Sequence, residues 1–382
     1  MNQNQNHNPV RIVAYPESPA ANDPARQDPR NPNALERRNN IAGIGGPRTT
    51  VRDQFVRAGL DWGVVTAPAR IANDIGPDGE PVVDFGGGII EGRRIVVRED
   101  KMSADGALGI VSDRYRPIQN LALADALDRG IRAAQQAGNA AAAGVGGAVT
   151  AGTWNGGRRV YCRLDLGGQE VAGCDPVRRH AIVTAAHDGT GSVKVTPVSI
   201  RLFCANQIPS IAKKGLRLRH TGTDLAAGIG RIVEALAAAA AEGAETWRRF
   251  EALARAGVDS RWVSHYFHQN AARTLGPVGL AAFAAGEPAA NAPAEDRRRW
   301  NAAHRQVMQR AAEFAERYHQ IGSIGHQPGG IAPTLQGTRW HALQAVTESH
   351  EYAAGGTPES RTEGTNGAHK AAALDLAEAV AV

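Results

Sequence analysis

Cysteine and aromatic residues are scarce in this sequence. Three of its 382 residues are cysteine, and phenylalanine, tryptophan and tyrosine together account for 5%. Cys162, Cys174 and Cys204 form no CxxC pair, and an odd number of cysteines argues against a disulfide framework. We therefore expect reduced thiols, and a core built mainly from alanine, valine, leucine and isoleucine.

Long apolar runs are missing as well. No stretch approaches the roughly 18 apolar residues that a membrane-spanning helix needs. The opening residues, MNQNQNHNPVRIV, lack the basic segment and the apolar core of a secretory leader. These absences predict a cytoplasmic protein that has no membrane partner.

The motifs of nucleotide-dependent enzymes are also missing. The sequence contains no GxxxxGKS or GxxxxGKT phosphate loop, and no GxGxxG fingerprint opens a helix after a strand. DFGGG (84–88) shares letters with the metal-binding triplet of protein kinases. No VAIK or HRD sequence accompanies it, so a glycine-rich hairpin is the better reading. We expect no cofactor.

The spacing of apolar residues divides the chain. Residues 1–50 are rich in Asn, Pro, Gly and charge, which predicts a disordered arm. Residues 51–222 hold short β-branched runs such as RRIVVRED, and one amphipathic helix, NLALADALDRGIRAAQQAG, for which Asn120 is the expected cap. Residues 223–353 show helical spacing, and residues 354–382 read as a flexible tail. Strands followed by helices predict an α+β fold: an antiparallel-rich sheet with at least one packed helix, then a helical C-terminal region, between two disordered tails.

The segment HDGTGSVKVTPVSIRLFCANQ (187–207) combines a turn with a strand. Asp followed by Gly is typical of a tight turn, because Gly accepts a positive φ and Asp bonds its own backbone. Alternating apolar residues then predict a strand. That pattern does not need Arg201, Asn206 or Gln207, so we expect these three to face a ligand.

Cations gather in and after this segment, in a chain whose net charge is +5. No acidic residue occurs between Asp188 and Asp224, and KKGLRLRH (213–220) would place alternate cations on one face of a strand. A groove that follows a nucleic-acid backbone needs several cations on one surface, and a tyrosine beside them can stack a base. The predicted nucleic-acid contacts are Arg114, Tyr115, Arg116, Arg201, Asn206, Gln207, Lys213, Lys214, Arg217 and Arg219.

Two other functions stay open. A metal-dependent or Cys-His hydrolase would use His187, Asp188, Cys204, Asn206 and His220. Cys204 lies in an apolar strand, where a thiolate is poorly solvated, and the spacings match no zinc pattern. We therefore assign no catalytic residue and no metal. The third function is that of a structural or host-interaction protein acting through the helical region. The oligomeric state stays open, a homo-oligomer included.

Seven motifs occur in an order that resembles the phage/plasmid-like family named domain of unknown function 932. They are WGV (62–64), VRED (97–100), LGIVSDRYRPIQN (108–120), HDGTGS (187–192), VSIRLFCAN (198–206), RLRHT (217–221) and TRWHALQAVTE (338–348). The resemblance implies a phage, prophage or plasmid gene and a protein of the bacterial cytoplasm, but no activity. Phage and plasmid genes of this size and pattern include single-strand annealing proteins. By that analogy we predict a nucleic-acid-binding protein, with single-stranded DNA favoured, acting in annealing or as a recombination accessory factor.

Overall fold

The computed structural model describes residues 49–70, 74–75, 81–82, 89–102, 106–136, 138, 145–202, 206–209, 217–218, 225–284, 286–289, 291–327, 330–351 and 365–380. The arm predicted for residues 1–50 lies outside them except for Thr49 and Thr50, and so does the glycine-rich hairpin predicted at 84–88. Within the described residues the chain is an antiparallel α+β protein with a helical C-terminal region, which confirms the predicted fold class.

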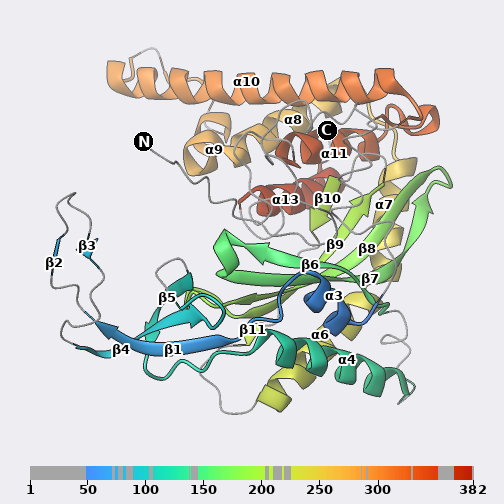
Figure 1. Ribbon diagram of the computed structural model, residues 1–382. Coiled ribbons are helices and arrows are strands. Elements are labelled where there is room, and N and C mark those ends of the chain that lie inside the picture. The colour runs from blue at the N-terminus through green and yellow to red at the C-terminus, as the bar shows by residue number, and fades with distance from the viewer. Residues whose placement is uncertain are drawn as a thin grey trace, which may run out of the picture.

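The larger sheet is an antiparallel meander at the centre of the molecule (Figure 1). Its strand order is β10-β9-β8-β7-β6, and a short strand, β11, pairs with β9. Consecutive strands are neighbours, as tight turns between alternating apolar runs predict. The strands are β6 (Ala148–Trp154), β7 (Arg159–Val171), β8 (Asp175–Ala186), β9 (Val193–Arg201), β10 (Asn206–Pro209) and β11 (Arg217–Leu218).

A smaller sheet lies beside the larger one, at the lower left of Figure 1. Its order is β1-β4-β5, all antiparallel, and a two-stranded hairpin, β2-β3, lies beyond its end. The strands are β1 (Val64–Arg70), β2 (Asp74–Ile75), β3 (Pro81–Val82), β4 (Ile89–Arg98) and β5 (Ala107–Ser112).

Three helices cover one face of the larger sheet: α3 (Val51–Arg57), α4 (Asn120–Gln136) and α6 (Leu225–Ala241). The apolar stripe expected on α4, made of Leu123, Leu127 and Ile131, is buried there. Helices α4 and α6 approach closely at Gly130, where a Cβ atom would come within 2.4 Å of Val233. This close approach leaves no room for a side chain at Gly130.

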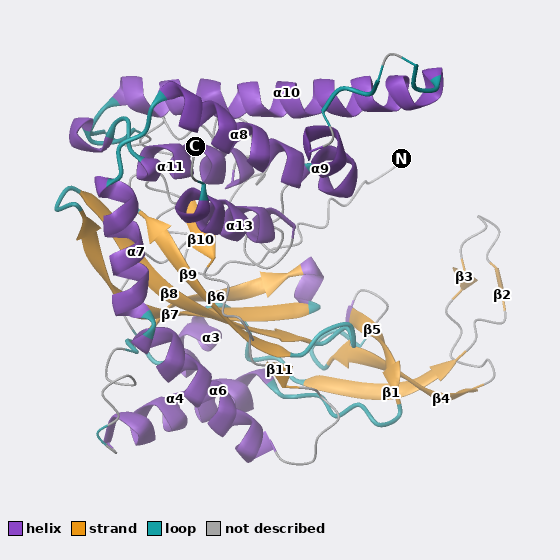
Figure 2. Ribbon diagram, turned by 180° about the vertical axis from the view of Figure 1, so that it is seen from behind, coloured by secondary structure: helices purple, strands orange, loops and turns teal. Residues whose placement is uncertain are grey.

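The other helices form a second layer above the sheet (Figures 1 and 2). Helix α11 is its centre and is buried on nearly every side, although several of its side chains are polar. The elements are α7 (Gly243–Arg255), α8 (Ser260–Thr274), α9 (Gly276–Ala284), α10 (Ala294–Ile324), the short 3-10 helix η3 (Pro333–Leu335), α11 (Arg339–Glu351) and α13 (Thr365–Ala379).

Residues 365–380 correct the prediction of a flexible tail at 354–382. Helix α13 packs its small apolar residues into the core of the helical layer. Trp262 Nε1 donates to the Val380 carbonyl, and Lys370 forms a fully buried ion pair of 2.6 Å with Glu351 on α11. An alanine-rich segment carries little hydrophobic signal of its own, but small side chains let two helices approach closely, and this explains the error.

The pair between Lys370 and Glu351 predicts a strong dependence of stability on the C-terminal helix. Lys370→Ala should lower the free energy of unfolding by about 3–5 kcal/mol, because it removes the ammonium that pairs with the buried carboxylate of Glu351. Urea denaturation measures the change. Glu378→Ala is the matched control, since it removes a surface ion pair with Arg249 from the same helix. Equal, small effects of the two substitutions would contradict this account.

Candidate functional site

The first polar centre lies where the two sheets meet, and we call it the junction centre: Trp62, Arg98, Asn120 and His187. His187 is fully buried, and its Nε2 lies 2.9 Å from Asn120 Oδ1. Asn120 Nδ2 donates to the Trp62 carbonyl, and the rings of Trp62 and His187 meet edge to face. The Arg98 guanidinium lies 4.4 Å from the centroid of the Trp62 ring. Four of the seven motifs therefore converge here.

Asp100 and Gln119 complete this junction. Asp100 accepts two hydrogen bonds from Arg98, at 2.9 and 2.7 Å, and this pairing lowers the pKa of its carboxyl. The amide of Gln119 bonds both the N–H and the carbonyl of Val64, and so bridges the start of α4 to β1. In these contacts the polar side chains of the motifs bind one another and the backbone, and they thereby hold the two sheets together.

Tyr115 also belongs to the packing, which corrects its predicted role in stacking a base. Its side chain is 6% exposed, and its hydroxyl donates to the Ala186 carbonyl at 3.3 Å. Burial raises the pKa of this phenol. Its neighbours Arg114 and Arg116 are exposed, as a phosphate contact requires.

The HDGTGS loop forms the tight turn that the sequence predicts. Asp188 Oδ1 accepts from the backbone N–H and the hydroxyl of Thr190, at 2.9 and 2.8 Å. Gly189 has φ +77°, and a Cβ there would come within 2.6 Å of Val111 on β5. The loop is therefore pressed against the smaller sheet.

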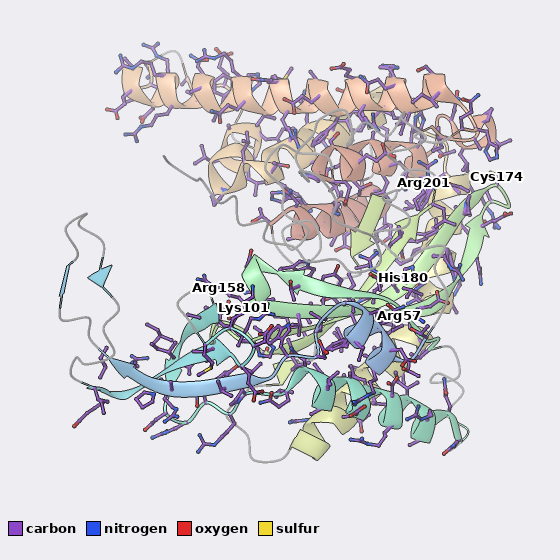
Figure 3. The ribbon with its side chains drawn as sticks, in the orientation of Figure 1. Arg57, Lys101, Arg158, Cys174, His180 and Arg201 are labelled. Carbon is purple, nitrogen blue, oxygen red and sulfur yellow. The ribbon has the colours of Figure 1, made fainter. Side chains whose placement is uncertain are left out.

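The second polar centre joins the larger sheet to the helical layer, and we call it the clamp: Asp175, Arg201, Arg317, Trp340 and Glu348. Arg201 Nε donates to both oxygens of Asp175, at 2.8 and 2.7 Å, and its Nη1 lies 3.4 Å from a Glu348 oxygen. The other Glu348 oxygen binds Arg317 on α10, and Trp340 Nε1 donates to Asp175. Figure 3 shows Arg201 at the end of the sheet nearest the helices.

The clamp corrects the prediction that Arg201 contacts phosphate. Its side chain is 0% exposed, and two carboxylates and the Gly330 carbonyl occupy its donors. A core strand does not need Arg201, and its presence is explained by two distant acidic partners. Asp175 is 26 residues away in the sequence and Glu348 is 147 residues away.

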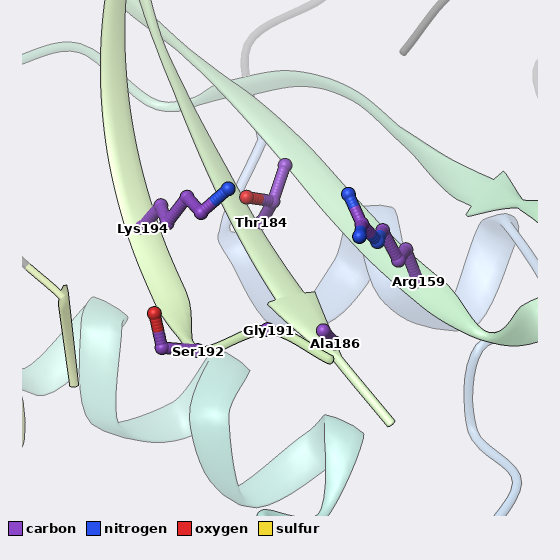
Figure 4. Close-up of a pocket in the computed structure, with 6 residues that line it drawn as sticks. All are labelled: Arg159, Thr184, Ala186, Gly191, Ser192 and Lys194. Carbon is purple, nitrogen blue, oxygen red and sulfur yellow. The ribbon is translucent and has the colours of Figure 1, made fainter. Parts of the chain in front are cut away.

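A shallow pocket opens at the opposite end of the larger sheet, beside the HDGTGS loop (Figure 4). Arg159 on β7 and Lys194 on β9 supply its cations, and Thr184 and Ser192 supply hydroxyls. Arg159 Nη2 donates to the Thr190 hydroxyl at 3.3 Å, and its Nε lies 3.9 Å from an Asp188 oxygen. The remaining lining residues are Ala186 and Gly191.

The described part of the basic stretch reaches this pocket. Strand β11 places Arg217 opposite Lys194 in the ladder with β9. Strand β10 places Asn206 opposite Arg201 and Gln207 opposite Ile200, at the other end of the sheet. Several predicted residues lie outside the described residues: Lys213, Lys214, Arg219, Cys204 and His220.

The prediction missed cations on β7 and β8. Arg159, Arg163 and Arg178 stand on one face of the larger sheet, the face that also carries Lys194 and His180. The alternation in RRVYCRLD (158–165) was the signal, since residues two apart in a strand share a face. The acid-free run indicates only β9 and the chain after it, because the shared face of three strands depends on their register.

The hydrolase hypothesis stays a prediction, because Cys204 and His220 lie outside the described residues. Nowhere in them do three or more His, Cys, Asp or Glu side chains gather in a way that could hold a metal ion. Burial raises the pKa of the Cys162 thiol, as expected for a cysteine inside an apolar strand. In the described part of the chain, no helix has the length and apolar character needed to cross a membrane.

The clamp predicts that Arg201 contributes to stability. Arg201→Ala should lower the free energy of unfolding by about 3–5 kcal/mol, because Asp175 stays buried without a counter-charge and Glu348 keeps only Arg317. Urea denaturation tests this, with Arg248→Ala as control in an ion pair that is 75% exposed at the arginine. If Arg201→Ala kept its stability and lost affinity for nucleic acid, the predicted phosphate contact would be right after all.

Two histidines of α11 predict acid lability. Burial lowers the pKa of His341 to about 4 and that of His350 to about 3. The unfolded chain takes up these protons near pH 6.5, so the stability present above that pH is lost as the pH falls towards the folded values. Between these pH values the free energy of unfolding falls by about 1.4 kcal/mol per pH unit for each histidine. Urea denaturation at pH 7.5, 6.0 and 5.0 should show it, and His350→Gln should make it shallower.

The comparisons with known proteins give a family. No curated protein and no solved structure matches the chain. A family model described as Domain of unknown function (DUF932) matches residues 107–374, which include the HDGTGS loop, the whole larger sheet and the clamp. The chain therefore belongs to the DUF932 family, as its motifs predict.

Proposed function

We propose that the protein binds single-stranded nucleic acid, with single-stranded DNA as the favoured ligand, along the sheet edge beside the HDGTGS loop. One observation carries the proposal. The basic stretch enters the larger sheet as β11, opposite Lys194, and Lys194 shares a pocket with Arg159. Arg159 and Lys194, which are distant in sequence, thus lie beside a third basic position. That position is Arg217, which belongs to the acid-free basic stretch.

The pocket has the chemistry of a phosphate contact. A guanidinium and an ammonium supply charge, and the hydroxyls of Thr184 and Ser192 supply neutral donors. In Figure 4 the Lys194 ammonium and the Thr184 hydroxyl point toward one another across neighbouring strands. Asp188 and Thr190 orient Arg159 from the loop side, so its guanidinium needs little reordering when a phosphate arrives.

Exposed cations extend the site on both sides. Arg114 and Arg116 flank Tyr115, whose hydroxyl bonds the carbonyl of the pocket residue Ala186. Arg158 is exposed, and its carbonyl accepts from the His187 N–H at the start of the loop. A row of cations along a shallow edge suits a polyanion better than a small ligand, since each neutralised phosphate releases counterions.

The elements around the pocket favour a single strand. Its lining residues all come from β7, β8, β9 and the HDGTGS loop. A helix is the element that most often enters the major groove of a duplex, and none lines this site within the described residues. Such a protein would act in annealing or recombination. The family resemblance implies that it is encoded by a phage or plasmid gene and works in the bacterial cytoplasm.

The proposal predicts a salt-dependent affinity that falls when Arg159 and Lys194 are replaced. Arg159→Ala with Lys194→Ala should raise the Kd for labelled oligo-dT about 30-fold, at about 1 kcal/mol per lost contact. The slope of log K against log salt should become shallower by about 1.4, because each phosphate contributes about 0.7 for a single strand. Fluorescence anisotropy between 50 and 300 mM NaCl provides both quantities.

The control removes the same charge from the helical layer. Arg248→Ala with Arg299→Ala deletes two arginines that are each 75% exposed, on α7 and α10. This variant should keep the affinity and the slope of the unmodified protein. Equal losses of affinity in both double variants would show that the effect depends only on the net charge of the protein. No binding at 50 mM salt would refute the proposal.

A further inference from the structure

We propose that His268 and Met308 form a binding site for a soft monovalent metal ion, and that Cu(I) is the ion this site fits. The two residues lie on helices α8 and α10, which pack against each other in the helical layer (Figure 1). His268 Nε2 is 3.1 Å from Met308 Sδ. The site shares no residue with the proposed nucleic-acid site and does not rest on the proposed function.

The hydrogen bonds of His268 decide which ring nitrogen carries the proton. Nδ1 is 2.7 Å from the carbonyl oxygen of Ser264, one turn earlier on α8, and 3.3 Å from the Ser264 hydroxyl oxygen. A carbonyl oxygen can only accept, so Nδ1 must donate. A neutral imidazole has a single N–H, and Nε2 therefore carries a lone pair and no proton.

Two electron-pair donors thus face each other at the contact between Nε2 and Sδ. A thioether sulfur has lone pairs and no hydrogen, so neither atom can donate to the other. A cation that accepts an electron pair from each of them makes the same arrangement favourable. Metal bonds of about 2.0 Å to nitrogen and about 2.3 Å to sulfur place two ligand atoms about 3.1–3.5 Å apart at angles of about 90–110°. The observed separation of 3.1 Å lies in this range.

The bond to Ser264 also orients the His268 ring as a metal ligand. Histidines that bind metals almost always donate their second ring N–H to a carboxylate, a backbone carbonyl or water, which fixes the tautomer and the direction of the ring. Met308 is 45% exposed and His268 is half-buried. An ion can therefore reach both ligand atoms from the solvent without a rearrangement of the helices.

The chemistry of the two ligands selects the ion. Thioether sulfur is a soft ligand that favours Cu(I), and imidazole also suits copper, whereas Mg²⁺ and Ca²⁺ prefer oxygen. Both ligands are neutral, so a monovalent ion leaves less charge uncompensated than a divalent one. Structural zinc sites use four nitrogen or sulfur ligands. Among the described residues, His268 belongs to no cluster of three or more His, Cys, Asp or Glu that could hold a metal ion.

Methionine labelled with 13C at the methyl group tests the site, because the chain has only three methionines. Ag(I) is the probe, since it has the charge and softness of Cu(I) and does not oxidise in air. It is added at pH 8, where protons compete least for the imidazole, after accessible thiols have been blocked with N-ethylmaleimide. The Met308 methyl signal, assigned by its loss in Met308→Leu, should shift and saturate. Met102, which is 64% exposed, is the internal control, and its signal should stay in place.

His268→Gln should weaken Ag(I) binding at Met308 by more than about tenfold, since even the loss of a group that only orients a metal ligand costs that much. His319→Gln, which removes an exposed histidine from α10, is the matched control and should leave the titration unchanged. Cu(I) added without oxygen should give the same pattern. Urea denaturation of each variant checks the fold.

Three results would overturn the inference. The Met308 methyl signal could stay in place, it could shift together with that of Met102, or His268→Gln could leave the Met308 titration unchanged. In the last two cases the sulfur would bind silver as any exposed thioether does, without the imidazole. None of these results bears on the proposed function, whose test uses oligonucleotides and the residues of the pocket.

Discussion

The arrangement of the two layers depends on one fully buried guanidinium. Arg201 ends β9 and binds Asp175 on the neighbouring strand and Glu348 on α11, and Glu348 in turn binds Arg317 on α10. Taking charges out of water is costly, and the cost is offset only when the geometry is complete and the remaining donors are satisfied. Helix α11 therefore has one allowed position against the sheet. The other helices pack around α11, so the clamp fixes the helical layer as a whole.

The junction centre has the same effect at the far end of the larger sheet. His187, Asn120 and Trp62 hold the smaller sheet and α4 against the HDGTGS loop. Between these two fixed ends, the strands carry Arg159 and Lys194 in rows that the ladder fixes. A site built on strands keeps its geometry better than one built on loops, because the ladder fixes each side chain relative to its neighbours. The most polar motifs of the sequence thus hold the sheet at its two ends, and the proposed site lies between them.

Much of the fold follows from the sequence, because alternation and helical spacing report burial directly. The amphipathic α4, the antiparallel-rich sheet and the helical C-terminal region are predicted in this way. The role of Arg201 is not, since a buried arginine and a surface arginine have the same local pattern, and only the distant Glu348 separates them. Helix α13 was missed because alanines pack well but signal weakly. The cations of β7 and β8 were missed because their shared face becomes visible only when the register of three strands is known.

The ion pairs of Arg201, Arg178 and Arg159 lengthen along the larger sheet from the clamp to the loop. At Arg201 the nearest carboxylate oxygen is 2.7 Å away and both side chains are 0% exposed. Arg178 lies 3.6 Å from Asp165 and is 31% exposed, and Arg159 lies 3.9 Å from Asp188 and is 19% exposed. Coulomb attraction weakens with distance and with access of water, so the pairs of Arg178 and Arg159 are weaker than the pair of Arg201 with Asp175. The same residue type therefore closes the fold at one end and, in the proposed function, meets phosphates at the other. How closely an acid fits beside each arginine thus distinguishes the clamp from Arg159, whose pair with Asp188 is 3.9 Å long.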